Sequence, residues 1–265
     1  MLTLLTISLA LAEESKFEGT KQGDDEKKAP EAHATVELGG SLTSGNTETM
    51  ALTGLGNVAY KWRRNGISST FGVNWGQSKI DADGDGLLSD AEHAADYVKT
   101  AERVHGTLRY DRFLGKRDSL YLLGGAFSDS FAGYDYRVNG QLGWSHNFVD
   151  KENVGFRGEL GVDIAREDFV VGIEPNAQTV VAARLLLGGR YAFNKNVSVE
   201  DTLEVYEGVL DFTDFRLNNT AALTATLGSK LALKLSHQLA FDNVPVEGYQ
   251  PLDHTTMATF VVTLL

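Results

Sequence analysis

The stretch from Tyr136 to Arg166 alternates apolar and polar side chains in two segments, which are joined by the short polar turn Asp150–Asn153. Apolar residues occupy most even positions of both segments, and many odd positions carry Arg, Asn, Gln, Ser, Glu or Asp. A side-chain period of two predicts β-strands, and a polar turn of this length predicts a hairpin.

The two faces of this hairpin restrict the fold further. Its polar face is charged, with Arg157, Glu159 and Asp163, so a soluble sandwich could not bury it. Its opposite face, with Leu160 and Val162, is too apolar to lie in water. A closed barrel satisfies both faces, because lipid covers the outside and the lumen inside is wet or ion-paired.

The same alternation recurs from Thr35 to the C-terminus and gives about 12 strands, an even number as in bacterial outer-membrane barrels. We therefore predict an all-β fold, a transmembrane antiparallel up-and-down β-barrel over residues 34–265. The connections after the second, fourth, sixth, eighth and tenth strands are tight, and those after the third, seventh and eleventh are long. With both termini in the periplasm, we expect the tight connections to be periplasmic and the long ones to lie outside the cell. The run Leu120–Leu123 is continuously apolar, so the facing of the fifth strand stays open. The last strand is expected at Thr256–Leu265.

Aromatic side chains gather on the apolar face near the tight turns. Such a girdle is typical of the two membrane–water interfaces. The alternative is that strand ends simply favour aromatic residues. The predicted girdle consists of Tyr60, Trp62, Tyr110, Trp144, Phe148, Phe156, Tyr191 and Phe193.

Composition excludes several classes of function. The formal net charge of -12 and the lack of a basic stripe argue against nucleic acid as a partner. The chain has 0 Cys, which excludes disulfides, thiolate chemistry and Cys-based metal sites. A mean hydropathy of -0.18 would not reveal a membrane protein, but membrane barrels escape hydropathy scans because alternate residues are polar.

The N-terminal segment predicts export. Residues 1–12 are apolar and end in small residues, as in a cleaved secretory signal peptide, although the basic region that usually precedes the apolar run is missing. Residues 13–33 are polar and charged, so we predict a disordered periplasmic tail. No later apolar run approaches the roughly 18 residues that a membrane helix needs.

On the predicted inward face, basic and acidic side chains nearly balance. A selective ion pore would show one sign at its constriction, whereas charges withdrawn from water are stable only when paired. A barrel of this strand number is wider than the filled type of about eight strands and narrower than the porins. We therefore expect cross-lumen ion pairs and a narrow or side-chain-plugged lumen. The predicted lumenal charges are Lys61, Arg103, Arg109, Arg137, Arg157, Arg184, Arg190, Lys234, Glu37, Asp111, Glu159, Asp163, Glu200, Glu204 and Asp242.

The segment 81–92 matches the ligand spacing of an EF-hand calcium loop, with Asp at loop positions one, three and five, Gly at six and Glu at twelve. A strand rather than a helix precedes it, and only Asp90–Tyr97 could form the following helix. We predict a calcium site with a Kd on the order of 10⁻⁴ to 10⁻³ M; the alternative is an acidic, flexible surface turn. The candidate metal ligands are Asp81, Asp83, Asp85, Leu87, Ser89 and Glu92.

Three motifs occur in a characteristic order: SGNTET at 44–49, TAER at 100–103 and FAGYDYR at 131–137. Together they resemble the salt-induced outer membrane protein family of the YdiY type, a domain of unknown function, over about Val36 to Leu265. The resemblance implies location in the bacterial outer membrane, with the lipid bilayer and lipopolysaccharide as surroundings and the barrel-assembly machinery as a partner during biogenesis. It supplies no substrate. Two features depart from the family: the calcium-like loop looks like an insertion, and the final residue is Leu265 rather than the aromatic residue that the assembly machinery usually reads.

Three functions remain open. The first is a non-enzymatic barrel that maintains envelope integrity or passes small solutes slowly through a narrow channel. The second is a calcium-dependent surface, carried by Asp81–Glu92, that attaches to lipopolysaccharide, matrix or another cell. The third, which we disfavour, is an outer-membrane phospholipase, a class that shares this strand number and uses Ser and His on the lipid-facing wall. His146 and His237 are predicted to face outward, but neither belongs to a recognisable Ser/His/acid constellation.

Overall fold

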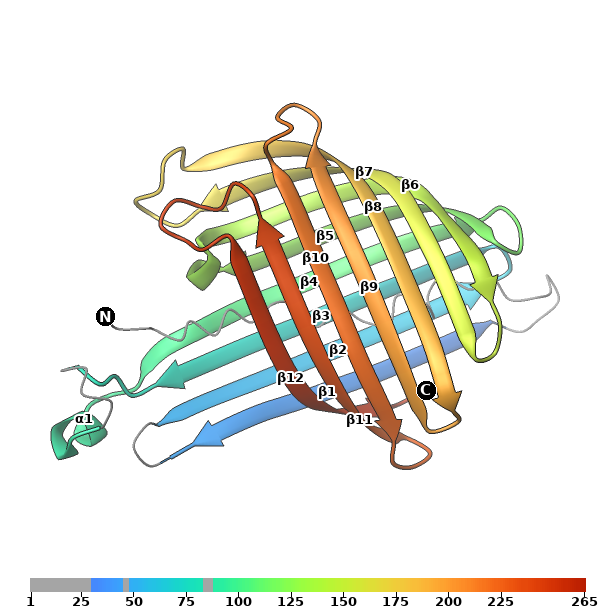
Figure 1. Cartoon of the computed structure of the whole chain (residues 1–265). Coiled ribbons are helices and arrows are strands. Elements are labelled where there is room, and N and C mark those ends of the chain that lie inside the picture. The colour runs from blue at the N-terminus through green and yellow to red at the C-terminus, as the bar shows by residue number, and fades with distance from the viewer. Residues whose placement is uncertain (1–29, 45–47, 83–87) are drawn as a thin grey trace.

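A computed structural model describes residues 30–44, 48–82 and 88–265, and within these ranges the chain forms a closed barrel of 12 strands (Figure 1). Each strand pairs antiparallel with its neighbours in sequence, and β12 closes the barrel on β1. No helix in the described part of the chain is long and apolar enough to cross a membrane. The predicted all-β barrel is confirmed. The elements are β1 (Glu31–Thr43), β2 (Thr49–Trp62), β3 (Asn65–Ser78), α1 (Asp90–Ala94), β4 (Val98–Phe113), β5 (Asp118–Asp129), the 3-10 turn η1 (Ser130–Ala132), β6 (Tyr134–Asp150), β7 (Val154–Phe169), β8 (Ala177–Asn194), β9 (Val197–Gly208), β10 (Phe215–Thr226), β11 (Leu231–Asp242) and β12 (Leu252–Thr263).

The two faces of each strand differ as the sequence predicts. On β7, Leu160 and Val162 are 55% and 47% exposed and point away from the barrel axis. The side chains at the odd-numbered positions of β7 point inward, and Glu159 and Asp163 among them are only 1% and 0% exposed. The apolar side chains therefore form the outer wall, and the charged ones fill the lumen, which is the arrangement that a lipid environment requires.

The ends of the barrel differ in the length of their connections. The turns after the even-numbered strands are short, and the connection between β3 and β4, which contains α1, is long. The chain enters and leaves at the short-turn end, because Glu31 pairs with Lys61 and the Leu264 N–H donates to the Ala34 carbonyl at 2.8 Å. That this end faces the periplasm stays a prediction.

The predicted aromatic girdle lies on the outer face at the short-turn end. Tyr60 and Trp62 stack with ring centroids 5.5 Å apart, and Phe148 and Phe156 lie 5.4 Å apart across the hairpin of β6 and β7. Rings in contact at one level of the wall are what an interfacial belt requires.

Several predicted boundaries need correction. The first strand begins at Glu31 rather than near residue 34, so residues 31–33 belong to the barrel and not to the tail. The last strand begins at Leu252 rather than Thr256. Its first residues are mostly polar, so they resemble a loop in the sequence. Residues 1–12, the predicted signal peptide, and 13–29 of the predicted tail lie outside the described residues.

The facing of β5 is now clear. Leu120 and Leu122 are 46% and 58% exposed on the outer wall, and Tyr121 between them is 1% exposed inside the lumen. The continuous apolar run therefore contains one lumenal aromatic side chain, which local alternation could not identify.

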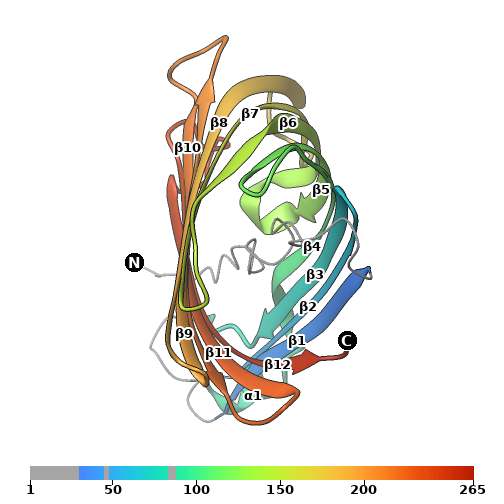
Figure 2. The ribbon, with the colours of Figure 1, turned by 90° about the vertical axis from the view of Figure 1, so that its right-hand side faces the viewer.

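The seam that closes the barrel is short. The register between β1 and β12 runs only from Thr35 opposite Thr263 to Gly39 opposite Thr259, and the two strands part toward the long-loop end (Figure 1). By contrast, β6 and β7 stay paired along almost their whole length. Seen end-on in Figure 2, the barrel is flattened, so β9 to β11 lie opposite β3 to β5.

Candidate functional site in the lumen

Glu159 on β7 lies at the centre of a buried group of charges in the short-turn half of the lumen. Its carboxylate contacts Arg109 Nη2 at 2.9 Å and Arg184 Nη1 at 2.8 Å, and Arg157 Nε lies 3.6 Å away. Strands β5 and β6 separate β4 from β7, so the contact between Arg109 and Glu159 crosses the lumen. We call this group the floor cluster. Its members are Arg109, Asp111, Ser119, Tyr121, Arg157, Glu159, Arg184 and Glu204.

Each end of the floor cluster has a further carboxylate. Arg109 donates from Nε and Nη2 to the two oxygens of Asp111 at 2.8 and 2.9 Å, and Arg184 pairs with Glu204 on β9. Two-point contacts between guanidinium and carboxylate fix geometry as well as charge. The floor cluster is therefore an ordered strut of side chains across the lumen.

Tyr121 completes this strut from β5. Its hydroxyl accepts from Arg184 Nη1 at 2.7 Å, and the guanidinium of Arg109 lies 4.3 Å from its ring centroid. The hydroxyl occupies the space over Gly143 and Gly161, where an added Cβ would lie 2.5 Å from it at either position. Glycine is needed there because any side chain would displace Tyr121.

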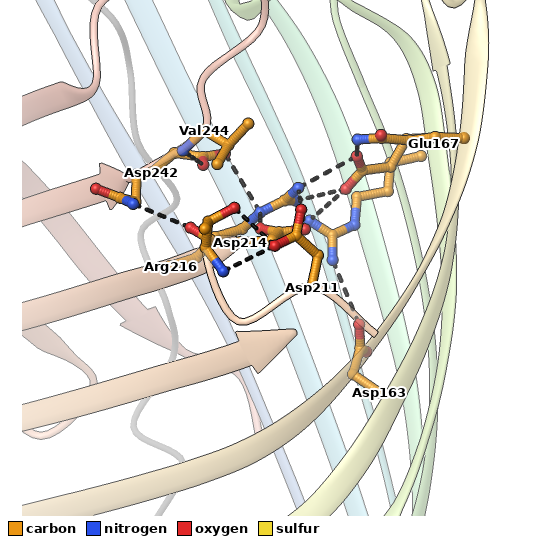
Figure 3. Close-up of polar contacts among 11 residues, drawn as sticks. Asp163, Glu167, Asp211, Asp214, Arg216, Asp242 and Val244 are labelled. Atoms are coloured by element: carbon orange, nitrogen blue, oxygen red, sulfur yellow. Dashed lines mark hydrogen bonds and ion pairs between the residues drawn. The ribbon is translucent and has the colours of Figure 1, made fainter. Parts of the chain in front are cut away.

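A second group of charges lies nearer the long-loop end, and Figure 3 shows Glu167, Asp214 and Asp242 around Arg216. Arg216 on β10 contacts Glu167 on β7, Asp214 at 2.9 Å and Asp242 on β11 at 3.3 Å. Arg137 on β6 joins it through a contact with Glu167 at 3.2 Å. We call this group the rim cluster. It consists of Arg137, Asp163, Glu167, Asp214, Arg216 and Asp242.

The predicted pairing of lumenal charges is confirmed for much of the inward face. Arg137 pairs with Asp163 at 3.3 Å, and Lys234 on β11 pairs with Glu37 on β1 at 2.9 Å. Sequence reasoning missed Glu167 and Arg216. Both have the parity of their inward neighbours, but they lie near strand ends, where the predicted strands stop too early.

Between the floor cluster and the long-loop end, the lumen holds a cavity of about 310 Å³. We call it the chamber. His105 and Gln238 line it, and neither ring nitrogen of His105 nor the amide of Gln238 has a hydrogen-bond partner among the described residues. Gln141 donates to the Tyr206 hydroxyl across the lumen at 3.2 Å. Between the charged clusters its wall also carries uncharged polar groups that both donate and accept hydrogen bonds. They include Thr70, Thr107, Asn139, Gln141, Tyr206, Asn218, Thr220 and Gln238.

Three connections meet above the chamber. The Val170 N–H donates to the Gly133 carbonyl at 3.0 Å, and the Tyr249 hydroxyl donates to the Ser130 carbonyl at 3.4 Å. Gly133 has φ of 86° and lies so close to Val246 that a Cβ would come within 2.8 Å of it. Only glycine fits this left-handed turn under a neighbouring loop. These contacts form the cap of the chamber.

The calcium-like loop is partly described. Asp83, Asp85 and Leu87 lie outside the described residues, whereas Asp81, Ser89 and Glu92 lie within them. The described part of the chain contains no cluster of three or more His, Asp or Glu side chains placed to hold a metal. The calcium site therefore stays a prediction.

Glu92 holds the two ends of this loop together. Its carboxylate accepts from the Ala82 N–H at 2.6 Å and from the Ser89 N–H at 2.8 Å, and Ser89 caps α1 in return. These hydrogen bonds lower the pKa of Glu92, so the side chain is ionised at neutral pH. The expected helix over Asp90–Tyr97 is shorter, since α1 ends at Ala94.

The α1 connection is tied to the β1–β2 turn. Glu48 accepts from the Tyr97 hydroxyl at 2.8 Å and lies 2.9 Å from His93 Nδ1. These two hydrogen bonds lower the pKa of Glu48, with the Tyr97 bond as the largest cause. A carboxylate on one connection thus anchors the other.

The two histidines considered for lipid-face catalysis lie on the outer wall. His146 contacts Asp118 at 2.8 Å among the girdle rings of Trp144 and Phe148. His237 lies 2.9 Å from the Thr256 hydroxyl. The girdle explains His146 as an interfacial side chain, whereas His237 lies on β11, away from the girdle.

Comparison with known proteins supports the fold. A family model described as "Protein of unknown function, DUF481" matches residues 36–264. Comparison with the curated proteins yields no significant match. Among solved structures, the NanC porin is 12% identical with a TM-score of 0.53, covering 87% of this chain and 100% of that chain.

Two further solved structures are similar at lower scores. An outer membrane channel from Pseudomonas putida F1 is 13% identical with a TM-score of 0.46, covering 92% of this chain and 99% of that one. The translocator domain of the autotransporter NalP from Neisseria meningitidis is 13% identical with a TM-score of 0.45, covering 87% and 86%. The barrel, its apolar outer wall and the likeness to the NanC porin place this chain in the bacterial outer membrane, embedded in the lipid bilayer.

Proposed function

Since this chain belongs to the DUF481 family and folds as a 12-stranded outer-membrane barrel, we propose that it is a narrow channel through which small polar solutes pass slowly. The observation that carries this proposal is the chamber, a cavity of about 310 Å³ between the floor cluster and the cap, whose wall combines apolar side chains with hydrogen-bonding groups. Cavities near 300 Å³ lie at the small end of sites for small molecules. The solute is therefore small.

The wall of the chamber supports a polar solute without a large net charge. His105 and Gln238 have buried donors and acceptors without partners in the described residues, and buried polar groups are stable when hydrogen-bonded. The arginines that reach the chamber are paired, as Arg184 is with Glu204 and Arg216 is with Glu167. A solute with hydroxyl or amide groups can satisfy the free groups without breaking those pairs.

Slow passage follows from the floor cluster. The strut that Arg109, Glu159 and Arg184 form is made of side chains, and the ladder of backbone hydrogen bonds around it does not change when a side chain moves. A guanidinium or carboxylate group can exchange a side-chain partner for a polar solute or water molecule that reaches it. Solute molecules can therefore pass one at a time, at the rate at which the strut rearranges.

The test measures permeability of the reconstituted barrel. Wild-type protein in planar bilayers should give brief, small conductance steps, and in liposomes it should pass small sugars or amino acids more slowly than an open porin does. The double variant Arg184→Ala/Glu204→Ala removes one cation and one anion from the floor cluster, and we expect at least a fivefold rise in conductance. Large, open, ohmic steps from the wild type would contradict the proposal.

The matched control removes an ion pair outside the lumen. Lys99 and Glu102 form an exposed pair at 2.7 Å, and Lys99→Ala/Glu102→Ala should leave conductance unchanged. A second lumenal variant, Tyr206→Phe, removes only the hydroxyl that receives the Gln141 hydrogen bond, so it tests the chamber without disturbing the charges. Absence of any permeability in the wild type and in both lumenal variants would instead favour a purely structural role in envelope integrity.

A second candidate function is calcium-dependent attachment through the α1 connection. The observation that favours it is the ionised Glu92 carboxylate, which faces back to Ala82 at the start of the loop. A ligand at loop position twelve that already reaches loop position two needs little rearrangement to close around a cation. Asp81, Asp83, Asp85, Leu87 and Ser89 would supply the remaining oxygens.

Calorimetric titration of the detergent-solubilised barrel with calcium chloride tests this second function. We expect heat with a Kd on the order of 10⁻⁴ to 10⁻³ M for the wild type and none for Glu92→Gln. Glu102→Gln, an exposed carboxylate on β4, is the control and should titrate like the wild type. Equal heats from the wild type and Glu92→Gln would remove calcium from the account, and unchanged cell attachment with or without calcium would remove adhesion.

A further inference from the structure

Polar side chains cross the middle of the outer wall over β9 to β12. Asp201 on β9 pairs in register with Ala221 on β10, Ala221 with His237 on β11, and His237 with Thr256 on β12. One step along the same ladder, Asn219 leads through Leu239 to His254. We call Asp201, Asn219, His237, His254 and Thr256 the outer polar band.

Every member of the outer polar band has outward parity. His237 lies between Leu235 and Leu239, which share its face of β11, and the inward side chain of Gln238 is 1% exposed in the lumen. The side chains of Asp201, His237, His254 and Thr256 are exposed. In the outer membrane they would therefore meet hydrocarbon rather than water.

The central outward positions of β4 to β8 are apolar. Leu108, Leu122, Leu142, Leu160 and Leu185 occupy central outward positions there and are all exposed. An ionisable side chain facing hydrocarbon is costly unless it has a partner, so its presence indicates a contact with something other than lipid tails.

The contacts inside the outer polar band leave its carboxylate without an opposite charge. At one end, the Asp201 carboxylate accepts from the Asn219 amide at 3.2 Å, and a neutral amide does not cancel its charge. At the other end, His237 lies 2.9 Å from the Thr256 hydroxyl, and its ring lies 6.1 Å from that of His254. An acid thus lies at one end, two imidazoles lie at the other, and the small Ala221 lies between them.

A second observation falls on the same face. Within the described residues, β12 pairs with β1 only over Thr259–Thr263, so residues 252–258 have a ladder partner on the β11 side alone. Unpaired backbone N–H and C=O groups are not tolerated in hydrocarbon. This edge adjoins His254 and Thr256, so the wall from β9 to the seam carries both side-chain and backbone groups that require cover.

We propose that the outer polar band is the contact face between two copies of this barrel in the outer membrane. A two-fold axis along the membrane normal exchanges the left and right edges of the band, so Asp201 of each copy faces the His237 and His254 edge of the other. Both acid–imidazole contacts form at once, and Ala221 at the centre lets the two walls approach closely, as small residues do at membrane interfaces.

Lipid is the weaker candidate occupant. The acyl chains that surround the middle of the strands cannot hydrogen-bond, and the anionic head groups of lipopolysaccharide would repel Asp201. A second copy supplies both an imidazole for Asp201 and a carboxylate for the histidines. The proposal is independent of solute passage, because the band lies outside the lumen.

Site-directed cross-linking tests the interface, and the chain suits it because it contains 0 Cys. Ala221→Cys places one thiol at the centre of the face, and Leu122→Cys places one on the opposite wall as the matched control. In vesicles at low protein-to-lipid ratio under oxidation, we expect at least tenfold more disulfide-linked dimer from Ala221→Cys than from Leu122→Cys. Equal yields from the two variants would overturn the proposal.

Charge exchange separates a specific contact from random collision. In the Ala221→Cys background, Asp201→His and His237→Asp should each lower the dimer yield at least fivefold, and the double exchange should restore it. A yield that neither single change alters, or a double exchange that fails to recover it while the barrel still resists unfolding by detergent, would also overturn the proposal. Conductance of the monomeric barrel should be the same in all these variants.

Discussion

The strands β9 and β11 each carry polar side chains on both faces, and the partners of these side chains differ between the two faces. Inside, Glu204 contacts Arg184 and Lys234 contacts Glu37, so each charge is met by an opposite charge. Outside, Asp201 on the same β9 receives a hydrogen bond from a neutral amide. Period-two alternation alone therefore does not say whether a polar residue is neutralised. The inner face pairs these charges within one chain, whereas the outer polar band gains an opposite charge only from a neighbour.

The largest effect should come from breaking the floor cluster. Glu159→Gln removes the carboxylate that Arg109 and Arg184 share and leaves buried cations without compensation. We expect a loss of about 3–5 kcal/mol in the free energy of unfolding, measured by urea titration of barrels in lipid vesicles. The control Glu102→Gln, on an exposed carboxylate, should change that free energy by less than about 0.5 kcal/mol.

A smaller loss is expected at the pair that Lys234 on β11 forms with Glu37 on β1. Lys234→Met roughly keeps the length of the side chain but removes the cation beside the buried Glu37 carboxylate. The Thr259 hydroxyl still donates a hydrogen bond to that carboxylate. The expected destabilisation is about 2–3 kcal/mol, read from the same urea titration. A stability equal to that of the wild type would mean that Glu37 is hydrated, and the contrast between inner and outer faces would weaken.

The opposite sign is expected on the outer face. Asp201→Leu in barrels diluted enough to be monomeric replaces a carboxylate that faces hydrocarbon, and it should raise the free energy of unfolding by about 1 kcal/mol. The matched inward change on the same strand, Glu204→Leu, should lower it. If both changes destabilise the monomer equally, Asp201 is not exposed to lipid.

The smallest effect is local and depends on pH. The Tyr97 and His93 hydrogen bonds lower the pKa of Glu48, so the tie between the β1–β2 turn and the α1 connection is fully present above the ordinary carboxylate pKa and is lost as pH falls through the lowered value. Protection of the amides of residues 89–97, measured as hydrogen exchange relative to the intrinsic rate at the same pH, should therefore fall at acidic pH while the barrel strands stay protected. Glu48→Gln should show the faster exchange already at neutral pH.

Much of the barrel could be predicted from the sequence because its information is local. The facing of Leu160 and Glu159, the short turn at 151–153 and the family motif at 131–137 each depend on neighbouring residues only. The family match over residues 36–264 confirms the resemblance to the YdiY-type salt-induced outer membrane proteins.

The partners of the lumenal charges could not be predicted in the same way. Whether Arg109 meets Glu159 depends on how far the closed sheet is staggered and flattened, and no single strand encodes that geometry. Tyr121 escaped notice because Leu120 and Leu122 on either side hid its parity. The outer polar band around Asp201 could not be predicted either. A single polar residue among outward apolar residues looks like an exception on its own strand, and only the register of the neighbouring strands shows that it belongs to a group.

The short seam between β1 and β12 sets where this molecule is weakest. A closed barrel opens most easily between the two strands that share the fewest backbone hydrogen bonds. Here these strands are β1 and β12, which pair only from Thr35 opposite Thr263 to Gly39 opposite Thr259. Detachment of the C-terminal strand should therefore begin the mechanical failure of the barrel. In the reverse direction, during insertion, we expect β1 and β12 to pair last, because they join the two ends of the sheet and gain few backbone hydrogen bonds.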